Sequence, residues 1–556
     1  MGFKEVFSGS KTKKTVLLLL SVCTLFSVYI MLTRYVFMYA NENMRADVAG
    51  QIVQMWEMRR TGTMFPKGWV DSSEIHLLAY PMYFISFIVN DGILVRNIAM
   101  FMFDCILLAL VIGLYKTMFH SRGYLIAVPV IFSNMFPGFF ARLFFKYGDY
   151  LQSVFYICLI MILLFTAFDD DLKVRSGRQR ILFLLTAVIS TFLGFQGWAQ
   201  VIVPLCAALC ICLYDRIREE KTFSSGTFKR ILTSPFSLMI YQLVIAGVIG
   251  TVLHELILAK LINVPGLGGA TRFADTEALA DVPRLLYLGI LEELLNVQPG
   301  TSFFSGSGIQ VFARIFAFYM LFVHAPRKAL DWRHDNTRMK ISKLYTVIAV
   351  AEMTLILFLG QSYSYASCIR YYAIPLFMVL IFDGEYLYRH FFEEAEESTS
   401  LIHAVLVCGM SLVLAADLLL PLNFRQNYQE TMASSRAITD CLREKGLTYG
   451  YSLYGNSNNN TAYANNTVKV VPVAFGGEHE FLQERLALSS WDWYDPDYYH
   501  GKSFLLIYKN DLELYDTCAS YADGTLLKDM TIDQFEYEEY VVWVFDHNLL
   551  NDMRYQ

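Results

Sequence analysis

Runs of about 20 consecutive apolar residues recur along most of the chain, and each approaches the length that an α-helix needs to cross a membrane. Hydrophobic residues make up 55% of the sequence and charged residues only 17%, which is too apolar for a soluble protein of 556 residues. The chain is therefore expected to be a polytopic α-helical membrane protein with about 11 transmembrane helices. The runs are Thr15–Ala40, Val95–Phe119, Tyr124–Pro137, Tyr150–Phe168, Ile181–Gly197, Val201–Tyr214, Phe236–Leu261, Ile309–His324, Tyr345–Gly360, Ile369–Phe382 and Ile402–Leu420.

Basic residues predict how these helices are oriented. The first run is too long for the core of a signal peptide and lacks a small-x-small cleavage site, so we interpret it as a retained anchor. Lysines precede it, at Lys4, Lys11, Lys13 and Lys14, and place the N-terminus in the cytoplasm. A plasma membrane is the expected location.

The short apolar segment Ile75–Val89 determines on which side of the membrane each later loop lies. It is interrupted by Pro81, and if it crossed the membrane the later basic loops would lie outside. Those loops are Lys173–Arg180, Arg216–Arg230 and Arg327–Lys343. An interfacial or re-entrant helix on the outer face returns them to the cytoplasm and places the C-terminus outside.

Hydropathy falls after residue 422, so residues 1–422 are predicted to form the membrane module, with exterior loops at 41–94 and 263–308, and residues 423–556 an extracytoplasmic α+β domain. A helix is expected at Ser434–Lys445, and the asparagines Asn458–Asn460 indicate a loop. Strands are predicted at Tyr449–Tyr454, Val468–Phe475, Phe504–Tyr508 and Tyr540–Phe545. Cys441 and Cys518 fall in this domain and could pair if it is exported.

The first exterior loop carries the strongest candidate for chemistry. Asn41, Glu42 and Asn43 precede a helix-like stretch, Arg45–Arg60, whose apolar residues recur at helical spacing and favour a helix lying along the membrane surface. Asp47 falls in its first turn, near the positive end of the helix dipole. A carboxylate there could act as a general base on an acceptor hydroxyl, although Asp is also common simply as a helix-start residue.

Two further places offer charges at the outer face. Arg142 and Lys146 precede Asp149 in the second exterior loop, where a cation could hold a phosphate or snorkel to the interface. Arg370 and Tyr371 open a late span from the outside. The planar guanidinium of an arginine matches phosphate oxygens, although an interfacial anchor would look the same in sequence.

A polar cluster precedes the interfacial segment and raises the question of a metal. Asp71, Glu74 and His76 lie close together in sequence, but a site for a divalent metal needs two or three ligands to converge, and this spacing gives only weak support for one. No cofactor is assigned. The net charge of −6, with Lys and Arg dispersed between apolar runs, argues against a nucleic-acid partner.

Taken together, these motifs resemble those of the bacterial C-class (GT-C) integral-membrane glycosyltransferases over nearly the whole chain. The resemblance rests on Asp47 after the anchor, on Arg96 opening a span, on the Arg370-Tyr371…Pro375 element and on the Tyr449–Asn458 stretch of the C-terminal domain. The run Met64–Trp69, followed by Ser73-Glu74-Ile75, completes the first of these features. The family often shows adjacent acids in the first loop, whereas here Glu42 and Asp47 are separated, which again leaves a metal unsupported.

This resemblance implies a function. Members of the family take a sugar from a polyprenyl-phosphate donor and attach it to a glycan or lipid acceptor outside the bilayer. Asp47 would correspond to the base and Arg370 to the donor-phosphate ligand, with Arg142 or Lys146 as a second phosphate contact. Two alternatives remain open: a polysaccharide polymerase or ligase using a diphosphate-linked glycan, and a lipid-linked-glycan transporter, which would carry polar residues at mid-membrane.

Overall fold

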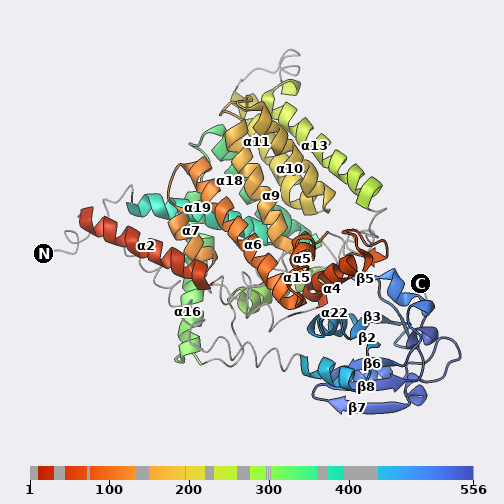
Figure 1. Ribbon diagram of the computed structural model, residues 1–556. Helices are drawn as coiled ribbons and strands as arrows, with labels where there is room; N and C mark the ends of the chain where they lie inside the picture. Colours follow the sequence, from red (N-terminus) through yellow and green to blue (C-terminus); the bar gives the residue numbers. More distant parts are fainter. Residues whose placement is uncertain are drawn as a thin grey trace.

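The computed structural model has a helical part and a C-terminal sheet-containing part, the latter in blue in Figure 1. It describes residues 10–30, 44, 46–71, 75–132, 149–194, 196–219, 231–258, 276–295, 297, 300, 302–359, 372–392 and 436–554. The two parts meet at a layer formed by α4 (Ala46–Thr61) and α5 (Ala79–Ile85).

Most of the predicted apolar runs are helical. The helices are α2 (Ser10–Ile30), α6 (Gly92–Leu114) with η2 (Tyr115–Phe119), α7 (Tyr124–Ile131), α9 (Asp149–Ala167), α10 (Gly177–Phe192), η4 (Trp198–Ile202) with α11 (Val203–Glu219), α13 (Pro235–Leu253) with η5 (His254–Leu258), α15 (Thr276–Leu288) with η7 (Gly289–Leu294), α16 (Gly306–Tyr319) with η8 (Met320–His324), α17 (Pro326–Ala329), α18 (Thr337–Leu359) and α19 (Ala373–Phe392). Within the described residues, four stretches are long and apolar enough to cross a membrane: Gly92–Phe119, Trp198–Arg218, Pro235–Ile257 and Gly306–Ala329. The polytopic architecture is thus confirmed, whereas a count of eleven spans is not, and the run at 402–420 lies outside the described residues.

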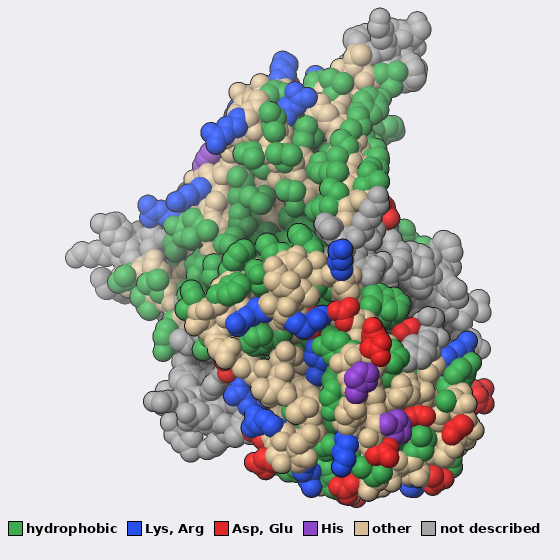
Figure 2. Space-filling view, turned by 45° about the vertical axis from the view of Figure 1, so that its right-hand side comes forward, with side chains coloured by type: hydrophobic (Ala, Val, Ile, Leu, Met, Phe, Trp, Pro, Cys, Tyr) green, Lys and Arg blue, Asp and Glu red, His purple; other side chains and the backbone are tan. Residues whose placement is uncertain are grey.

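The outer surface of the helical part is apolar, as lipid contact requires. On α10 and α13, Ile181, Leu185, Ile245 and Val248 are exposed, and Figure 2 shows hydrophobic side chains covering much of this region while acidic ones gather on the C-terminal domain. Contiguous exposed apolar surface on this scale marks a membrane or partner contact. Helices α10 and α13 pack closely because Gly250 has no Cβ, which would lie 2.0 Å from the Thr191 hydroxyl.

The C-terminal domain is built on a six-stranded mixed sheet in the order β4-β3-β2-β6-β8-β7. Strand β2 (Tyr449–Leu453) is parallel to both β3 (Lys469–Gly476) and β6 (Ser503–Tyr508), and the other neighbours are antiparallel. The remaining strands are β4 (Phe481–Glu484), β7 (Asp533–Tyr537) and β8 (Tyr540–Phe545). The expected helix at Ser434–Lys445 is present at 436–444, and its Leu442 joins the apolar core on one face of the sheet.

The parallel β2–β3 pair needs a crossover, and α22 (Tyr454–Tyr463) supplies it. Helix α22 contains Asn458–Asn460, so the prediction of a loop there was wrong. The buried Asn458 amide donates a hydrogen bond to the Leu488 carbonyl at 3.0 Å, and the Asn460 amide donates one to the Asn456 carbonyl at 2.6 Å. Tertiary packing thus overrides the low helix propensity of asparagine.

Helix α4 does not lie along a lipid surface, as its pattern had suggested. Twelve of its 16 residues are buried, because Ile52 and Met55 pack into the core of the helical part while Val53 packs into the core of the C-terminal domain. Gly50 allows the close approach, since a Cβ there would lie 2.7 Å from Leu488 Cδ1. A helix between two parts of a protein is buried on both sides, and the sequence pattern cannot distinguish a protein core from lipid on either side.

A short strand pair also joins the first loop to the C-terminal domain. Strand β1 (Trp69–Val70) is antiparallel to β5 (Ser489–Ser490), and the Trp491 backbone N–H donates to the Gly68 carbonyl at 2.7 Å. The Trp69 ring is fully buried and packs edge-on against Trp493, with their centroids 6.1 Å apart. Residues 46–71 are therefore held between the membrane helices and the domain.

Cys441 and Cys518 are both free thiols in this fold, so the pairing considered from sequence does not form here. Cys518 is fully buried, and burial raises the pKa of its thiol to about 12. It therefore behaves as a small apolar core residue with an inert thiol.

The C-terminal domain should become less stable at alkaline pH because of His547. Its Nδ1 lies 2.7 Å from Asp546 and its Nε2 lies 2.6 Å from Asp552. Partial burial acts to lower the pKa of His547, but the hydrogen bonds to Asp546 and Asp552 outweigh it and raise the pKa above the usual 6.5. The stabilisation is complete below pH 6.5 and is lost as the pH rises through the higher folded-state value. Thermal melting should show this loss in wild type and not in His547→Gln. Equal pH dependence in the two proteins would contradict the assignment.

Candidate active site between the first loop and the C-terminal domain

Asp47 lies where the two parts of the molecule meet. It occupies the first turn of α4 and is partly buried, and its Oδ1 accepts a hydrogen bond of 2.5 Å from the hydroxyl of Tyr454. Tyr454 belongs to the first turn of α22, which packs along α4. The carboxylate is therefore positioned by two elements that are far apart in sequence, and the amide ends of α4 favour its negative charge.

The hydrogen bond occupies one carboxylate oxygen of Asp47. Tyr454 is itself oriented by the domain, because the Arg485 guanidinium lies over its ring at 6.0 Å from the centroid. A carboxylate fixed through one oxygen can present the other to a hydroxyl group, which is the geometry that a general base requires. Tyr454 belongs to the Tyr449–Asn458 stretch noted in the sequence, but nothing local predicted its contact with Asp47.

Further along α4, a buried ion pair connects the same two parts. Glu57 Oε1 lies 2.9 Å from Lys469 Nζ, and the Glu57 and Lys469 side chains are only 1% and 11% exposed. The Trp493 indole N–H donates to the same oxygen at 3.2 Å, while Arg60 binds Oε2 at 2.7 Å. Burial acts to raise the pKa of Glu57, but the charges and hydrogen bonds of Lys469 and Arg60 outweigh it and lower the pKa below its usual value. Glu57 is thus an ionised anchor rather than a proton-transfer group.

The polar cluster predicted around His76 is partly assembled. His76 Nδ1 lies 2.7 Å from Asp71 Oδ1, and the Gln54 amide donates to Asp71 Oδ2 at 3.3 Å, with all three side chains buried. These contacts link the segment before α5 to α4. Among the described residues, no group of three or more His, Cys, Asp or Glu side chains is arranged to hold a metal ion.

The remaining predicted residues cannot be compared with the structure. Glu42, Glu74, Arg142, Lys146, Arg370 and Tyr371 lie outside the described residues, and Asp149 begins α9 with no described side chain. The start of α9 does lie near the first loop, because Gln152 Oε1 accepts a hydrogen bond from the Leu77 backbone N–H at 3.4 Å. Asp149 is therefore on the same side of the helical part as α4.

The roles of Glu57, Lys469 and Tyr454 were not predicted from the sequence. Only for Glu57 does the sequence carry a signal, namely a charged residue within the helix α4. Charged residues inside a helix that is otherwise buried need partners, but the burial of α4 was not expected. Arg96 is also fully buried near the start of α6, next to the buried Asn97. A buried arginine within an apolar span is costly and is a common mark of a functional region.

No protein-family model and no curated protein sequence matches the chain. By structure, it is similar to ArnT from Cupriavidus metallidurans in the apo state, with a TM-score of 0.50 and 10% sequence identity, covering 96% of this chain and 98% of that chain. The crystal structure of ArnT from the same organism bound to undecaprenyl phosphate gives a TM-score of 0.48 at the same identity and coverage. At this identity the likeness concerns the fold alone. The chain therefore has a polytopic membrane fold similar to that of ArnT.

Proposed function

We propose that the chain is a membrane glycosyltransferase that moves a sugar from a polyprenyl-phosphate donor to a glycan or lipid acceptor, at the membrane face that carries the C-terminal domain. The single observation that carries the proposal is the contact between Asp47 and Tyr454, which fixes a carboxylate at the junction of the first loop and the domain. The fold shared with ArnT supports the class of enzyme. ArnT has itself been crystallised with undecaprenyl phosphate, which suggests the class of lipid to test.

In the proposed reaction, the other oxygen of Asp47 accepts the proton of an acceptor hydroxyl while that hydroxyl oxygen attacks the anomeric carbon. A new glycosidic bond forms and the bond from the anomeric carbon to the phosphate oxygen breaks. The polyprenyl phosphate leaves as an anion with the bonding electron pair, and a cation must stabilise it. We assign this task to Arg370, with Arg142 or Lys146 as a second contact, because a guanidinium suits phosphate oxygens.

The C-terminal domain has two roles in this proposal. Tyr454 holds the base in place, and the exposed side of the domain next to α4 is where an acceptor would approach. Opposite charges are exposed at the other end of α4, about 20 Å from Asp47 by helix rise, since Arg60 pairs with Asp492 at 2.5 Å and both side chains are more than one-third exposed. An extended polar acceptor such as a glycan could reach this pair.

A donor-panel assay tests the proposed class. Purified full-length protein is incubated with radiolabelled polyprenyl-phosphate sugars, with polyprenyl-diphosphate glycans in parallel, and with a membrane extract as the source of acceptor. The proposal predicts label transfer from at least one monophosphate-linked sugar together with release of polyprenyl phosphate. Consumption of a diphosphate-linked glycan alone would contradict it and favour a polymerase or ligase.

Removing the Tyr454 hydroxyl should slow transfer without weakening donor binding. Tyr454→Phe leaves the ring in place but removes the hydrogen bond to Asp47, and loss of such a bond to a charged group should lower kcat about tenfold. Steady-state kinetics measures the change, with KM for the donor expected to stay near wild type. Tyr521→Phe, at an exposed tyrosine of the same domain, is the matched control. Equal kcat for Tyr454→Phe and wild type would show that Tyr454 does not position the base.

A further inference from the structure

A pocket lies at the end of the helical part remote from Asp47. It is formed where the turn between α9 and α10 meets the start of α13, and its volume is about 240 Å3. Helix α9 has 19 residues and is therefore about 28 Å long. Its first turn lies near the first loop and its last residue, Ala167, near the pocket, so the pocket is at the opposite membrane face from α4.

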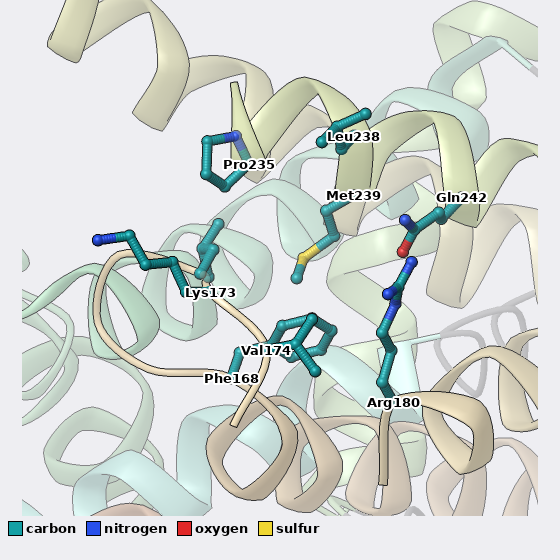
Figure 3. A pocket seen from close by; sticks show the side chains of 9 residues that line it. Phe168, Lys173, Val174, Arg180, Pro235, Leu238, Met239 and Gln242 are labelled. Atoms are coloured by element: carbon teal, nitrogen blue, oxygen red, sulfur yellow. The ribbon is translucent and has the colours of Figure 1, made fainter. Parts of the chain in front are cut away.

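The lining combines cations with apolar side chains. Lys173 and Arg180 line the pocket together with Gln242, and Figure 3 shows Arg180 extending toward Gln242, while the Lys173 amine lies at the opposite side of the pocket and points away from both. The apolar lining residues are Phe168, Leu172, Val174, Pro235, Leu238 and Met239. Lys173 is paired with Asp171 at 3.2 Å, but both are well exposed, whereas no described residue offers the Arg180 guanidinium a hydrogen bond or ion pair. The pocket therefore has a net positive lining.

The turn that carries Lys173 is fixed by its own hydrogen bonds. The Asp169 carboxylate accepts from the backbone N–H groups of Asp171 and Lys173, at 3.0 and 2.8 Å, and Phe168 forms a β-bridge with Val174. Arg338 of α18 clamps the turn by donating to the Asp170 carboxylate at 2.8 Å and to the Phe168 carbonyl at 3.0 Å. A rigid turn presents its cation without further ordering of the backbone, which favours binding.

The two helices that border the pocket both begin there. The Ser176 hydroxyl caps α10 by accepting from the Gln179 N–H, and the Ser234 hydroxyl caps α13 by accepting from the Ser237 N–H. Their partial positive ends add to the charges of Lys173 and Arg180 and favour an anion. The chemistry of the lining thus indicates a phosphate group joined to an apolar body.

The surface next to the pocket identifies the source of that ligand. Leu238 lines the pocket and is 48% exposed, and the outer face of α13 continues with the exposed Tyr241 and Ile245. On the other side, the exposed Ile181 and Leu185 extend along α10 from Arg180. The acyl chains of a lipid can lie along this apolar surface while the lipid headgroup occupies the pocket. A free phosphate ion would make no contact with this surface.

We propose that this pocket binds the headgroup of an anionic phospholipid from the leaflet opposite the C-terminal domain. Arg180 binds the phosphate and the neighbouring Gln242 contacts the polar part of the headgroup. Lys173, at the opposite edge of the pocket, adds to its positive potential, and the apolar residues pack against the start of the acyl chains. The volume is smaller than that of a typical ligand pocket, which holds about 300–1,000 Å3, and suits a headgroup rather than a whole lipid. This proposal does not depend on the glycosyltransferase proposal.

Native mass spectrometry of the full chain in neutral detergent tests the site, with dioleoylphosphatidylglycerol, dioleoylphosphatidylcholine and inorganic phosphate as probes. Wild type should bind a first molecule of phosphatidylglycerol with higher affinity than a first molecule of phosphatidylcholine. Lys173→Gln/Arg180→Gln should weaken the binding of phosphatidylglycerol about tenfold, because each basic residue near a lipid phosphate contributes substantially. The matched control is Arg175→Gln/Arg178→Gln, which removes two exposed cations of the same turn and helix that do not line the pocket.

Three results would overturn the proposal: equal weakening in the control, equal binding of both lipids by wild type, or unchanged binding in the lining variant. Displacement of phosphatidylglycerol by inorganic phosphate at similar concentration would assign the site to a free anion instead. If the double variant does not purify as a folded monodisperse protein, Arg180→Gln alone is compared with Arg178→Gln, with the same expected direction.

Discussion

Lys469→Met should destabilise the docking of the C-terminal domain on α4 by about 3 kcal/mol, because it leaves a buried carboxylate without one of its partners. The Lys469 ammonium lies 2.9 Å from Glu57 and 4.3 Å from the centre of the Trp493 ring, so the substitution removes an ion pair and a cation–π contact together. Arg60 still binds Glu57, which keeps the expected loss at the lower end of the range for a broken buried pair. Thermal melting followed by tryptophan fluorescence measures the loss.

Two comparisons separate this effect from loss of a positive charge in general. Lys509→Met removes a lysine of an exposed pair with Glu536 and should change stability by less than about 1 kcal/mol. Glu57→Gln/Lys469→Met removes both charges and should be more stable than Lys469→Met, since the buried carboxylate is gone. A Lys469→Met protein that melts like Lys509→Met would show that the ion pair does not hold the two parts together.

Asp47→Asn should lower the rate of sugar transfer about 10³-fold, within the range found for loss of a general base. The amide keeps an oxygen that can accept the Tyr454 hydrogen bond, so the fold and donor binding should be retained, while the group no longer accepts a proton. Steady-state kinetics should therefore show a fall in kcat with little change in KM for the donor.

The controls for Asp47→Asn use other carboxylates. Asp47→Glu keeps a base but displaces it by one methylene group, and it should retain more activity than Asp47→Asn. Asp440→Asn removes an exposed carboxylate paired with Arg443 in the C-terminal domain and should leave the rate unchanged. Wild-type rates in Asp47→Asn would remove Asp47 from the mechanism and make Asp149 the next residue to substitute.

The helical architecture and the four strands could be predicted because both have local signals. Apolar runs of membrane length and alternating or β-branched segments are properties of neighbouring residues, and β2, β3, β6 and β8 fall close to the predicted ranges. Strands β4 and β7 were missed because they lie at the edges of the sheet, where the alternation is weak and the β7 side chains are mostly exposed. Helix α22 was missed because its asparagines are stabilised by partners elsewhere in the fold.

The residues of the candidate site also differ in whether the sequence around them carries a local signal. Asp47 could be proposed from its place after the first apolar run and in the first turn of a helix. Its partner Tyr454 and the pair of Glu57 with Lys469 could not, because each joins residues about 400 positions apart and pairing at that distance has no local signal. The pattern of α4 was interpreted as lipid contact for the same reason, since a side chain that packs against a protein core is as apolar as one that meets lipid.

A single turnover with donor already bound tests the role of Asp47 as the base most directly. Wild-type and Asp47→Asn proteins are loaded with the radiolabelled polyprenyl-phosphate sugar that the panel identifies, mixed rapidly with acceptor, and quenched at intervals to measure polyprenyl phosphate and labelled product. We predict that wild type forms both at equal rates and that Asp47→Asn binds the donor but forms neither on that timescale. Equal formation of product by the two proteins would contradict the assignment of Asp47 as the base.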